Sequence, residues 1–330
     1  MLSSLVDMSS KRLIDRRKFL AAGAGLAFGG TAIAYLTRDT LRSPFCANST
    51  AEDVTAGIDL TGKTALVTGC NSGIGYETMR VLALRGAHVL GTARTAEKGQ
   101  EACANVEGRC TPVVLKLTDF DSVVACANQV NAMDVSLDIL VCNAGVLHRE
   151  HREKNGIELH FLVNHLGRFL LTRRLLSSVL AVPNGQVVVL GSGAHANAPD
   201  HGIYFDDLSG RSWSTSAYSH SKLANGLFAF ELARRFEGTN ATSNCVNPGN
   251  VVTNIFRYSD IPWNKEGEHV KSIAQGAATS CYVATSPKLA DVNGYYFFDC
   301  NPASPSALKQ NVELANRLWD VSDELVSEYL

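Results

Sequence analysis

The sequence lacks an excess of charge of either sign, and it lacks a linker that would divide it. Lys and Arg total 30 against 32 Asp and Glu, a formal net charge of −2. Nothing in the bulk charge therefore indicates nucleic acid or an anionic membrane surface as a partner. No Pro-, Gly- or Ser-rich stretch interrupts residues 60–330, and there is no internal repeat or low-complexity segment. With 330 residues, 45% of them hydrophobic, the chain is expected to form one large domain behind a leader.

Patterns typical of metal sites and disulfide scaffolds are also missing. The nine cysteines all follow residue 45, and no pair has metal-ligand spacing. An odd count without a framework argues against a disulfide scaffold. Cys142 and Cys245 lie in apolar strand-like runs, where a reduced thiol behaves as a small hydrophobic side chain. We therefore predict no metal site.

The first forty residues differ in composition from the rest. Residues 11–20 are basic, and residues 21–36 are apolar and rich in Ala and Gly. Arg16-Arg17-Lys18-Phe19-Leu20 resembles a bacterial twin-arginine signal for export to the periplasm. Residues 19–36 are also about long enough to anchor the chain in a membrane. We expect residues 1–36 to be one or the other, with residues 37–60 as a polar tether and residues 61–330 as the domain.

From Leu60 onward, runs typical of strands alternate with helical patterns. The apolar runs lie at 64–68, 87–91, 112–117, 137–142, 186–191, 242–246 and 294–298. Helical periodicity lies at 74–85, 96–105, 120–132, 157–181, 217–236, 268–284 and 304–330. This alternation predicts an α/β fold with a single Rossmann-like, doubly wound, mostly parallel sheet and helices on both faces.

A glycine-rich turn follows the first predicted strand and leads into a helix. Glycine allows a sharp turn and a close approach of the backbone to a ligand. The N-terminus of the following helix suits a pyrophosphate. We therefore expect a dinucleotide site at this turn. Its residues are Gly69, Asn71, Ser72, Gly73, Ile74 and Gly75.

The end of the second predicted strand bears on the choice of nucleotide. NAD-selective folds carry an acidic residue near this point, which bonds the ribose 2′-hydroxyl. This sequence has Arg94 instead and no acid in the strand. A guanidinium favours a 2′-phosphate, so NADP is expected in preference to NAD. The alternative is that Arg94 is a solvated loop residue.

Three further groups of residues are expected at the same crevice. Asn143-Ala144-Gly145 ends a strand with small residues, which let the backbone pass close to a ligand. Tyr218 and Lys222 are four residues apart on a predicted helix and share one face, so the ammonium is expected to lower the pKa of the phenol toward a useful value. Ser192 follows an apolar strand and places a hydroxyl at the rim. Hydride transfer needs such a hydroxyl and such a phenol.

Together these motifs resemble, in their order, the short-chain dehydrogenase/reductase superfamily. They are Thr68-Gly69-x-x-x-Gly73-Ile74-Gly75, Asn143-Ala144-Gly145, Ser192, Tyr218-x-x-x-Lys222 and Asn247-Pro248-Gly249. The chain is most similar to the retinol-dehydrogenase-like and WW-domain-oxidoreductase-like branch, through residues 163–167, 221–225 and 296–300. The resemblance covers residues from about 60 to the C-terminus and excludes the leader.

The resemblance implies a catalytic tetrad of Asn164, Ser192, Tyr218 and Lys222. Tyr218 would be the general acid/base, and Ser192 would hold the reacting oxygen. Lys222 would lower the pKa of the tyrosine and bind the nicotinamide ribose, and Asn164 would hold a water that links Lys222 to solvent. The resemblance also implies that the nicotinamide end contacts Pro248, Gly249, Val251 and Thr253.

The sequence also departs from the usual pattern of the superfamily. Ser192 and Tyr218 are 26 residues apart, a longer separation than in common members, and the insert 195–213 resembles that of the retinol-dehydrogenase-like branch. Cys142 replaces the first asparagine of the usual turn. Lys116 stands where an acid often contacts adenine, which puts that contact in doubt. His195 and His201, both in the insert, are expected to be ordinary loop histidines.

The substrate side is the least specified. The aromatic-rich segment 255–263 is either a lid over an apolar substrate or a loop packed on the core. We predict an NADP-dependent oxidoreductase that interconverts an apolar or bulky alcohol and its carbonyl. The alternatives are a non-catalytic dinucleotide-binding or scaffold protein and a related sugar-nucleotide epimerase. The sequence leaves open whether the chain forms a homo-oligomer.

Overall fold

A computed structural model describes residues 38–133, 135–213, 216–259 and 269–330. The chain divides into two compact units, Met1–Arg42 and Ser43–Leu330. The predicted leader at 1–36, with its twin-arginine motif and candidate anchor, lies outside the described residues. Among the residues that are described, none of the helices has both the length and the apolarity to cross a bilayer.

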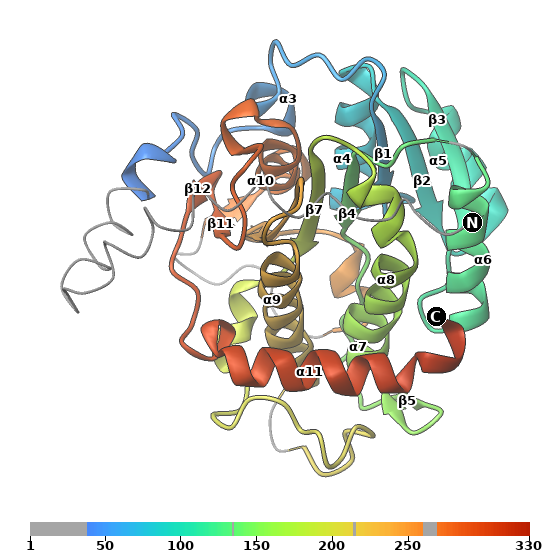
Figure 1. Ribbon diagram of the computed structural model, residues 1–330, viewed down its shortest axis with the longest axis vertical. Coiled ribbons are helices and arrows are strands. Elements are labelled where there is room, and N and C mark those ends of the chain that lie inside the picture. The colour runs from blue at the N-terminus through green and yellow to red at the C-terminus, as the bar shows by residue number, and fades with distance from the viewer. Residues whose placement is uncertain (1–37, 134, 214–215, 260–268) are drawn as a thin grey trace, which may run out of the picture. The chain divides into compact units, whose positions relative to one another are not determined.

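The second unit is built on an eight-stranded sheet of order β12-β11-β8-β7-β4-β1-β2-β3 (Figure 1). All neighbouring strands are parallel except β11 and β12. The strands are β1 (Thr64–Val67), β2 (His88–Ala93), β3 (Cys110–Val114), β4 (Ile139–Cys142), β7 (Gly185–Leu190), β8 (Ala241–Asn247), β11 (Tyr296–Phe298) and β12 (Asn301–Pro302). Strands β1, β2, β4 and β7 are buried along their whole length, as expected of parallel strands covered on both faces.

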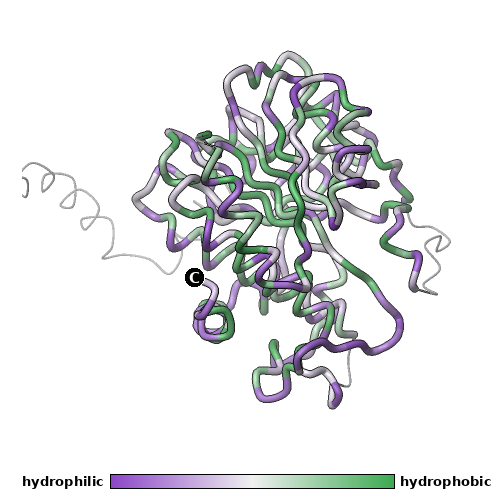
Figure 2. The backbone as a smooth tube through the Cα atoms, turned by 90° about the vertical axis from the view of Figure 1, so that its right-hand side faces the viewer, coloured by the Kyte–Doolittle hydropathy of each residue, from purple (hydrophilic) through white to green (hydrophobic). Residues whose placement is uncertain are grey.

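Helices cover the sheet on both sides, which confirms the predicted doubly wound α/β fold (Figure 1). Helix α4 packs against α10, α6 against α8, and α9 against α11. The hydrophobic segments gather in the middle of this unit (Figure 2), where Phe169 lies 4.9 Å from Trp319 and 5.7 Å from Phe228 between ring centroids. The main helices are α4 (Gly73–Leu84), α5 (Ala96–Ala104), α6 (Phe120–Asn131), α8 (Gly167–Leu180), α9 (Ala217–Arg235), α10 (Ile273–Thr285) and α11 (Val312–Leu325).

Two helices begin later than predicted, because a side-chain cap fixes the start of each. Helix α10 begins at Ile273 and not at residue 268, because Ser272 and Gln275 form a capping box. The helix predicted over 304–330 begins only at Val312, where Asn311 accepts a hydrogen bond from the backbone of Leu314. Ahead of this cap the chain forms only the short turn η5 (Leu308–Gln310).

The stretch predicted as one helix over 157–181 is divided. It begins with β6 (Ile157–Glu158), which pairs with β5 (Glu153–Lys154) through a turn in which Asn155 and Gly156 have φ values of 54° and 75°. An Asn-Gly pair is a strong hairpin signal, and our sequence analysis did not use it. The helical part is α7 (Leu159–Phe161), a π-helical turn η1 (Leu162–Leu166) and α8.

Residues 37–60 were expected to form a polar tether, but from Ser43 onward they pack against the domain. Helix α3 (Ala51–Val54) has a capping box made by Thr50 and Asp53, and it packs against α10. The Ser43 hydroxyl donates to the Cys300 carbonyl oxygen at 2.9 Å. Residues 43–60 therefore belong to the packed domain.

One disulfide joins Cys103, in α5, to Cys110, in β3, with the two Cα atoms 5.4 Å apart. The other seven cysteines are free, and six of them are buried. The odd count of cysteines argues against a disulfide scaffold, and this single pair was not predicted from the sequence.

Candidate active site

The crevice lies where the strand order reverses, between β1 and β4. The glycine turn follows β1, and Asn143-Ala144-Gly145 follows β4. The Thr68 hydroxyl accepts hydrogen bonds from the backbone N–H groups of Asn143 and Ala144, both at 2.9 Å. The Asn143 side chain donates to the Thr68 carbonyl oxygen at 2.8 Å. These hydrogen bonds, including the one from the Asn143 side chain, hold the two turns together as one surface.

The start of α4 fits an anionic ligand. Its N-cap residue, Ser72, makes no side-chain capping bond, and its first turn carries no acid. By contrast α5, α6, α9, α10 and α11 are all capped by a side chain. A Cβ on Gly75 would lie 2.3 Å from the Gly69 carbonyl oxygen, so the tight turn requires glycine. A free helix N-terminus behind such a turn suits the pyrophosphate of a dinucleotide.

The segment after β8 lies against this turn. A Cβ built on Gly73 would lie 3.3 Å from the Thr253 side chain. Gly249 has a φ of 85°, and Val251 is buried in β9 (Asn250–Val251), which pairs with β10 (Val270–Lys271). Of the four residues predicted for the nicotinamide end, Thr253 thus lies directly against the glycine turn.

Arg94 and Lys116 follow the strands on the other side of the switch point. Arg94 comes directly after β2 and is exposed, with no hydrogen bond or ion pair to another described residue. Lys116 is also exposed, and its backbone N–H donates to the Ser122 hydroxyl at 3.0 Å. Both side chains are accessible to a nucleotide.

Ser192, Tyr218 and Lys222 meet at the ends of β7 and α9. The Ser192 hydroxyl hydrogen-bonds to the Tyr218 phenol. Lys222 Nζ lies 5.5 Å from the centroid of the Tyr218 ring and donates to the Leu190 carbonyl oxygen at 3.3 Å. Lys222 is only 3% exposed, whereas Tyr218 is half-buried. The predicted serine, tyrosine and lysine are therefore in mutual contact range.

Asn164 lies fully buried within the π-helical turn η1. Its Oδ1 accepts from the Val146 backbone N–H at 2.8 Å, and its Nδ2 donates to the Ser221 hydroxyl at 3.0 Å. Ser221 in turn donates to the Tyr218 carbonyl oxygen at 2.8 Å. Single π-helical turns occur often at functional sites. Here the turn connects the residues after β4 to α9.

Burial controls the protonation of both groups on α9. It raises the pKa of Tyr218 to about 12, although the Ser192 hydrogen bond and the Arg168 charge act in the opposite direction. Burial, followed by the Arg168 charge, lowers the pKa of Lys222 to about 7. The expectation that Lys222 brings the pKa of Tyr218 below its usual value is therefore wrong for the protein alone, because desolvation of the phenol outweighs the nearby cations.

Arg168, a buried charged residue of this site, was not predicted from the sequence. Arg168 is 2% exposed and donates to the Leu190 carbonyl oxygen at 3.2 Å and to the Ala144 carbonyl oxygen at 2.9 Å. The available signal was a lone Arg within the apolar run 161–171. Buried charges are rare and need partners, so its position could have been singled out.

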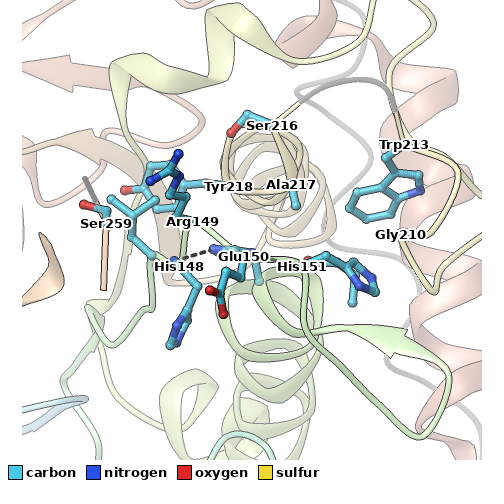
Figure 3. A pocket seen from close by; sticks show the side chains of 13 residues that line it. His148, Arg149, Glu150, His151, Gly210, Trp213, Ser216, Ala217, Tyr218 and Ser259 are labelled. Atoms are coloured by element: carbon cyan, nitrogen blue, oxygen red, sulfur yellow. Dashed lines mark hydrogen bonds and ion pairs between the residues drawn. The ribbon is translucent and has the colours of Figure 1, made fainter. Parts of the chain in front are cut away.

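A pocket of about 600 Å³ opens beside Tyr218 (Figure 3). Tyr218 and Ser216 lie at the start of α9, between Trp213 on one side and His148 and Ser259 on the other (Figure 3). The pocket is lined by Leu147, His148, Arg149, Glu150, His151, Glu158, His160, Gly210, Trp213, Ser216, Ala217, Tyr218 and Ser259. Trp213 comes from the insert, so the insert contributes a wall of the pocket.

A buried carboxylate–imidazole pair supports the pocket. His160 Nδ1 lies 2.6 Å from Glu158 Oε1, and both side chains are at most 3% exposed. His160 Nε2 accepts from the His148 backbone N–H at 2.9 Å, which places the proton of a neutral ring on Nδ1. The His148 ring stacks on Tyr258 at 4.9 Å and 8°. The sequence analysis missed this pair.

The remaining predictions are only partly covered by the described residues. Ile255–Ser259 of the aromatic-rich segment is attached to the pocket wall, since the Arg149 backbone N–H donates to the Tyr258 carbonyl oxygen at 3.0 Å. Residues 260–263 lie outside the described part. His195 is more than a loop histidine: it is 6% exposed, and its ring bonds to the Ser192 carbonyl oxygen at 2.6 Å. Within the described ranges, no three His, Cys, Asp or Glu side chains gather as a candidate metal site.

Comparison with known proteins identifies the family. The family model for short chain dehydrogenases matches residues 63–261. The chain belongs to the short-chain dehydrogenase/reductase family. This match spans the glycine turn and all four residues of the predicted tetrad.

Curated members of this family resemble the chain along most of its length. It is 40% identical to short-chain dehydrogenase TIC 32 A, chloroplastic, of Brassica napus, over 86% of this chain and 95% of that protein. It is 39% identical to retinol dehydrogenase 12 of Mus musculus, over 89% and 94%. It is 36% identical to the WW domain-containing oxidoreductase of Homo sapiens, over 89% and 75%. The resemblance to the retinol-dehydrogenase-like branch is thus confirmed.

Solved structures agree with this assignment. An uncharacterized protein from Mycobacterium paratuberculosis matches with a TM-score of 0.67 and 29% identity, over 85% of this chain and 98% of that chain. A short chain dehydrogenase from Burkholderia cenocepacia in complex with NADP shares the fold, with a TM-score of 0.58 and 24% identity over 72% and 96%. The chain is an oxidoreductase of the short-chain dehydrogenase/reductase family that acts on CH–OH groups and their carbonyl counterparts.

Proposed function

We propose that this short-chain dehydrogenase/reductase uses NADP to interconvert an apolar alcohol and its carbonyl, with Tyr218 as the general acid/base. The observation that carries the proposal is the Ser192–Tyr218 hydrogen bond at the edge of a 600 Å³ pocket. A hydroxyl and a phenol at one point can bind and protonate the same substrate oxygen.

The proposed mechanism assigns one task to each side chain. The bound nicotinamide supplies hydride acceptor and donor chemistry. Tyr218 gives its phenolic proton to the substrate oxygen in reduction and takes it back in oxidation, while Ser192 holds that oxygen. Lys222, with a pKa of about 7, accepts or releases a proton near neutral pH. Asn164 fixes the start of α9 through Ser221.

Three observations support NADP as the cofactor. The uncapped start of α4 fits a pyrophosphate. Arg94 is exposed directly after β2, where a 2′-phosphate would lie in a dinucleotide fold, and no acid stands in that strand. A family member of the same fold has been crystallised with NADP. The proposed cofactor contacts are Gly69, Asn71, Ser72, Gly73, Ile74, Gly75, Arg94, Asn143, Ala144, Gly145, Tyr218, Lys222, Pro248, Gly249, Val251 and Thr253.

The pocket supports an apolar substrate with a flat or bulky body. Trp213, Leu147 and the stacked His148–Tyr258 pair offer apolar and aromatic surface. The buried Glu158–His160 pair is already satisfied by its own hydrogen bonds, so it offers no free charge to a polar substrate. These surfaces select a substrate by shape and apolar contact, while the charged Arg149 and Glu150 lie at the exposed rim of the pocket.

Turnover by Tyr218→Phe tests the proposal. The full chain is screened for NADPH consumption with apolar ketones and aldehydes, and NADPH and NADH affinities are measured by fluorescence titration. Tyr218→Phe should lower turnover by about 10²–10⁴-fold and change NADPH affinity far less, because the other proposed cofactor contacts remain. Tyr329→Phe, which alters a tyrosine packed on Phe120, is the control and should keep both. Retained turnover in Tyr218→Phe would overturn the mechanism, and tight NADPH binding without any turnover in wild type would favour a non-catalytic binding protein.

The leader remains a prediction from sequence, either a twin-arginine export signal or an anchor within residues 1–36. The Cys103–Cys110 disulfide supports an oxidising compartment. Free NADP(H) is not expected outside the cytoplasm, so export would require a cofactor that travels with the folded enzyme. N-terminal sequencing of the mature protein from fractionated cells tests cleavage and compartment together.

A further inference from the structure

Arg168 is a buried guanidinium in the middle of the site. It is 2% exposed and is the largest of the fully buried side chains in the described part of the chain. Its two hydrogen bonds join the turn after β4, through Ala144, to the end of β7, through Leu190. The first of these turns belongs to the proposed cofactor site, and Ser192 lies two residues beyond the second. One side chain thus sets the spacing between the two halves of the crevice.

The Arg168 charge has no carboxylate partner among the described residues. The groups that act on it electrostatically are Cys142, Cys245 and Tyr218. Burying a charge without a counter-ion is costly, and carbonyl oxygens compensate only in part. Of these three groups, Tyr218 is the one whose anion the proposed reaction forms. Arg168 therefore lies where its charge would attract and stabilise a Tyr218 phenolate.

Two cations converge on a single acceptor. The Leu190 carbonyl oxygen accepts from Arg168 Nη1 at 3.2 Å, from Lys222 Nζ at 3.3 Å and from Asn225 Nδ2 at 3.1 Å. An arginine keeps its proton even when burial lowers its pKa, whereas a lysine readily loses its proton. The fixed charge of Arg168 and the titrating charge of Lys222 therefore differ in role, although they share one partner.

Other charged or titratable groups surround Tyr218 and must be weighed beside Arg168. They are Glu158 and His160 before α8, Lys222 on α9, Cys142 on β4, Cys245 on β8, Lys309 on η5, and His148, Arg149, Glu150 and His151 along the pocket. Lys309 is buried and its pKa is lowered. Arg149 lies at the exposed edge of the pocket. Arg168 is the buried cation of this set whose charge persists over the working pH range.

We propose that Arg168 is a positioning residue of the redox site, which holds the Ala144 turn against the end of β7 and supplies a permanent positive charge to Tyr218 and Lys222. The proposal rests on the proposed function, since it concerns the tyrosine that exchanges the substrate proton. Removing a cation makes both neighbours easier to protonate, so Arg168→Gln raises the pKa of Tyr218 and that of Lys222 together. A purely structural arginine would lower activity equally at all pH values.

The test compares three variants of the full chain. Arg168→Gln removes the charge and keeps an amide donor. Arg168→Lys places an ammonium there, which is charged only below its own pKa. Arg173→Gln removes a partly exposed arginine of α8 that pairs with Asp323. The pH profile of kcat/KM is measured for NADP-dependent alcohol oxidation. In Arg168→Gln the acid limb should move up by about one pH unit, which lowers kcat/KM about tenfold below the limb. Arg168→Lys should restore most of that loss, and Arg173→Gln should match wild type.

A second readout does not depend on turnover. The chain is labelled with 3-fluorotyrosine, which is more acidic than tyrosine, and Tyr218 is titrated by ¹⁹F NMR with NADP present, the resonance being assigned with Tyr218→Phe. Arg168→Gln should raise the titration midpoint of this group. If wild type turns over no alcohol or carbonyl, the proposed function fails while the NMR titration still decides the role of Arg168.

Several outcomes would overturn the proposal. One is a uniform loss of activity in Arg168→Gln with neither the limb nor the NMR midpoint displaced. Another is an acid limb that moves down in pH in Arg168→Gln instead of up. If Arg168→Gln does not fold, Arg168→Lys decides at the lowest pH of the profile, where its ammonium is charged: a kcat/KM like that of wild type there supports the proposal, and a tenfold loss overturns it.

Discussion

Replacing Lys222 with Met should stabilise the folded chain most at neutral pH and progressively less as the pH rises. Burial and the Arg168 charge lower the pKa of Lys222 from 10.5 to about 7, while the unfolded chain keeps the ordinary value. Between these pH values the unfolded state binds more protons, so the stability of wild type rises by up to about 1.4 kcal/mol per pH unit from this group. Met has no charge to desolvate. Its stability advantage should therefore shrink by about 3 kcal/mol from pH 7 to pH 10.

The packing at Lys222 makes this variant a clean perturbation. The Leu190 carbonyl oxygen keeps Arg168 and Asn225 as donors, so the substitution leaves no orphaned acceptor, and the unbranched Met stem fills a similar space. Urea unfolding of both chains, followed by circular dichroism at several pH values, gives the two free energies. Lys98→Met, at an exposed site on α5, should show a gap that does not change with pH. If the difference in free energy of unfolding between Lys222→Met and wild type were equally independent of pH, the reasoning would be refuted.

Three further predictions concern the cofactor turn, the nucleotide choice and the pocket. Gly75→Ala should lower the free energy of unfolding by about 1–3 kcal/mol and weaken NADPH binding, because its Cβ would lie 2.3 Å from the Gly69 carbonyl oxygen. Gly99→Ala, whose Cβ would come closest to Pro112 Cβ at 3.1 Å, should keep NADPH affinity in the same titration. Arg94→Ser should weaken NADPH binding about tenfold or more and leave NADH binding nearly unchanged; equal losses for both nucleotides would contradict the 2′-phosphate role. Glu158→Ala should cost about 1–3 kcal/mol in thermal or urea unfolding, because it leaves the buried Nδ1–H of His160 without an acceptor; an unchanged stability would contradict that bond.

The sheet was predictable from the sequence because its strands are buried on both faces. Strands β1, β4 and β7 therefore appear as uninterrupted apolar runs, and their order along the chain selects the doubly wound arrangement. Element boundaries were less predictable, because single capping side chains such as Ser272 and Asn311 set them. The tether expected over 37–60 was too broad, since two small apolar residues of α3, Ala51 and Val54, suffice to pack that polar stretch.

Some residues of the site were likewise predictable from the sequence, and others were not. Residues with family motifs could be predicted, and the structure brings Ser192, Tyr218 and Lys222 together. Arg168 and the Glu158–His160 pair could not be assigned a role from sequence, because their partners are backbone groups and rings that only the fold brings near. Arg168 bonds to carbonyl groups 22 and 24 residues away in the chain, and no local pattern records such a contact.

The cluster of cations around Leu190 lowers the stability of this part of the core. A fully buried Arg168 and a nearly fully buried Lys222 repel each other while both bind one carbonyl oxygen, an arrangement that apolar residues of similar volume would improve. Sequences depart from the rules of stable packing chiefly where function requires it. The two cations lie beside Tyr218, the phenol that carries a negative charge in the proposed turnover. Their cost in stability is then the expected counterpart of a site prepared to hold a phenolate.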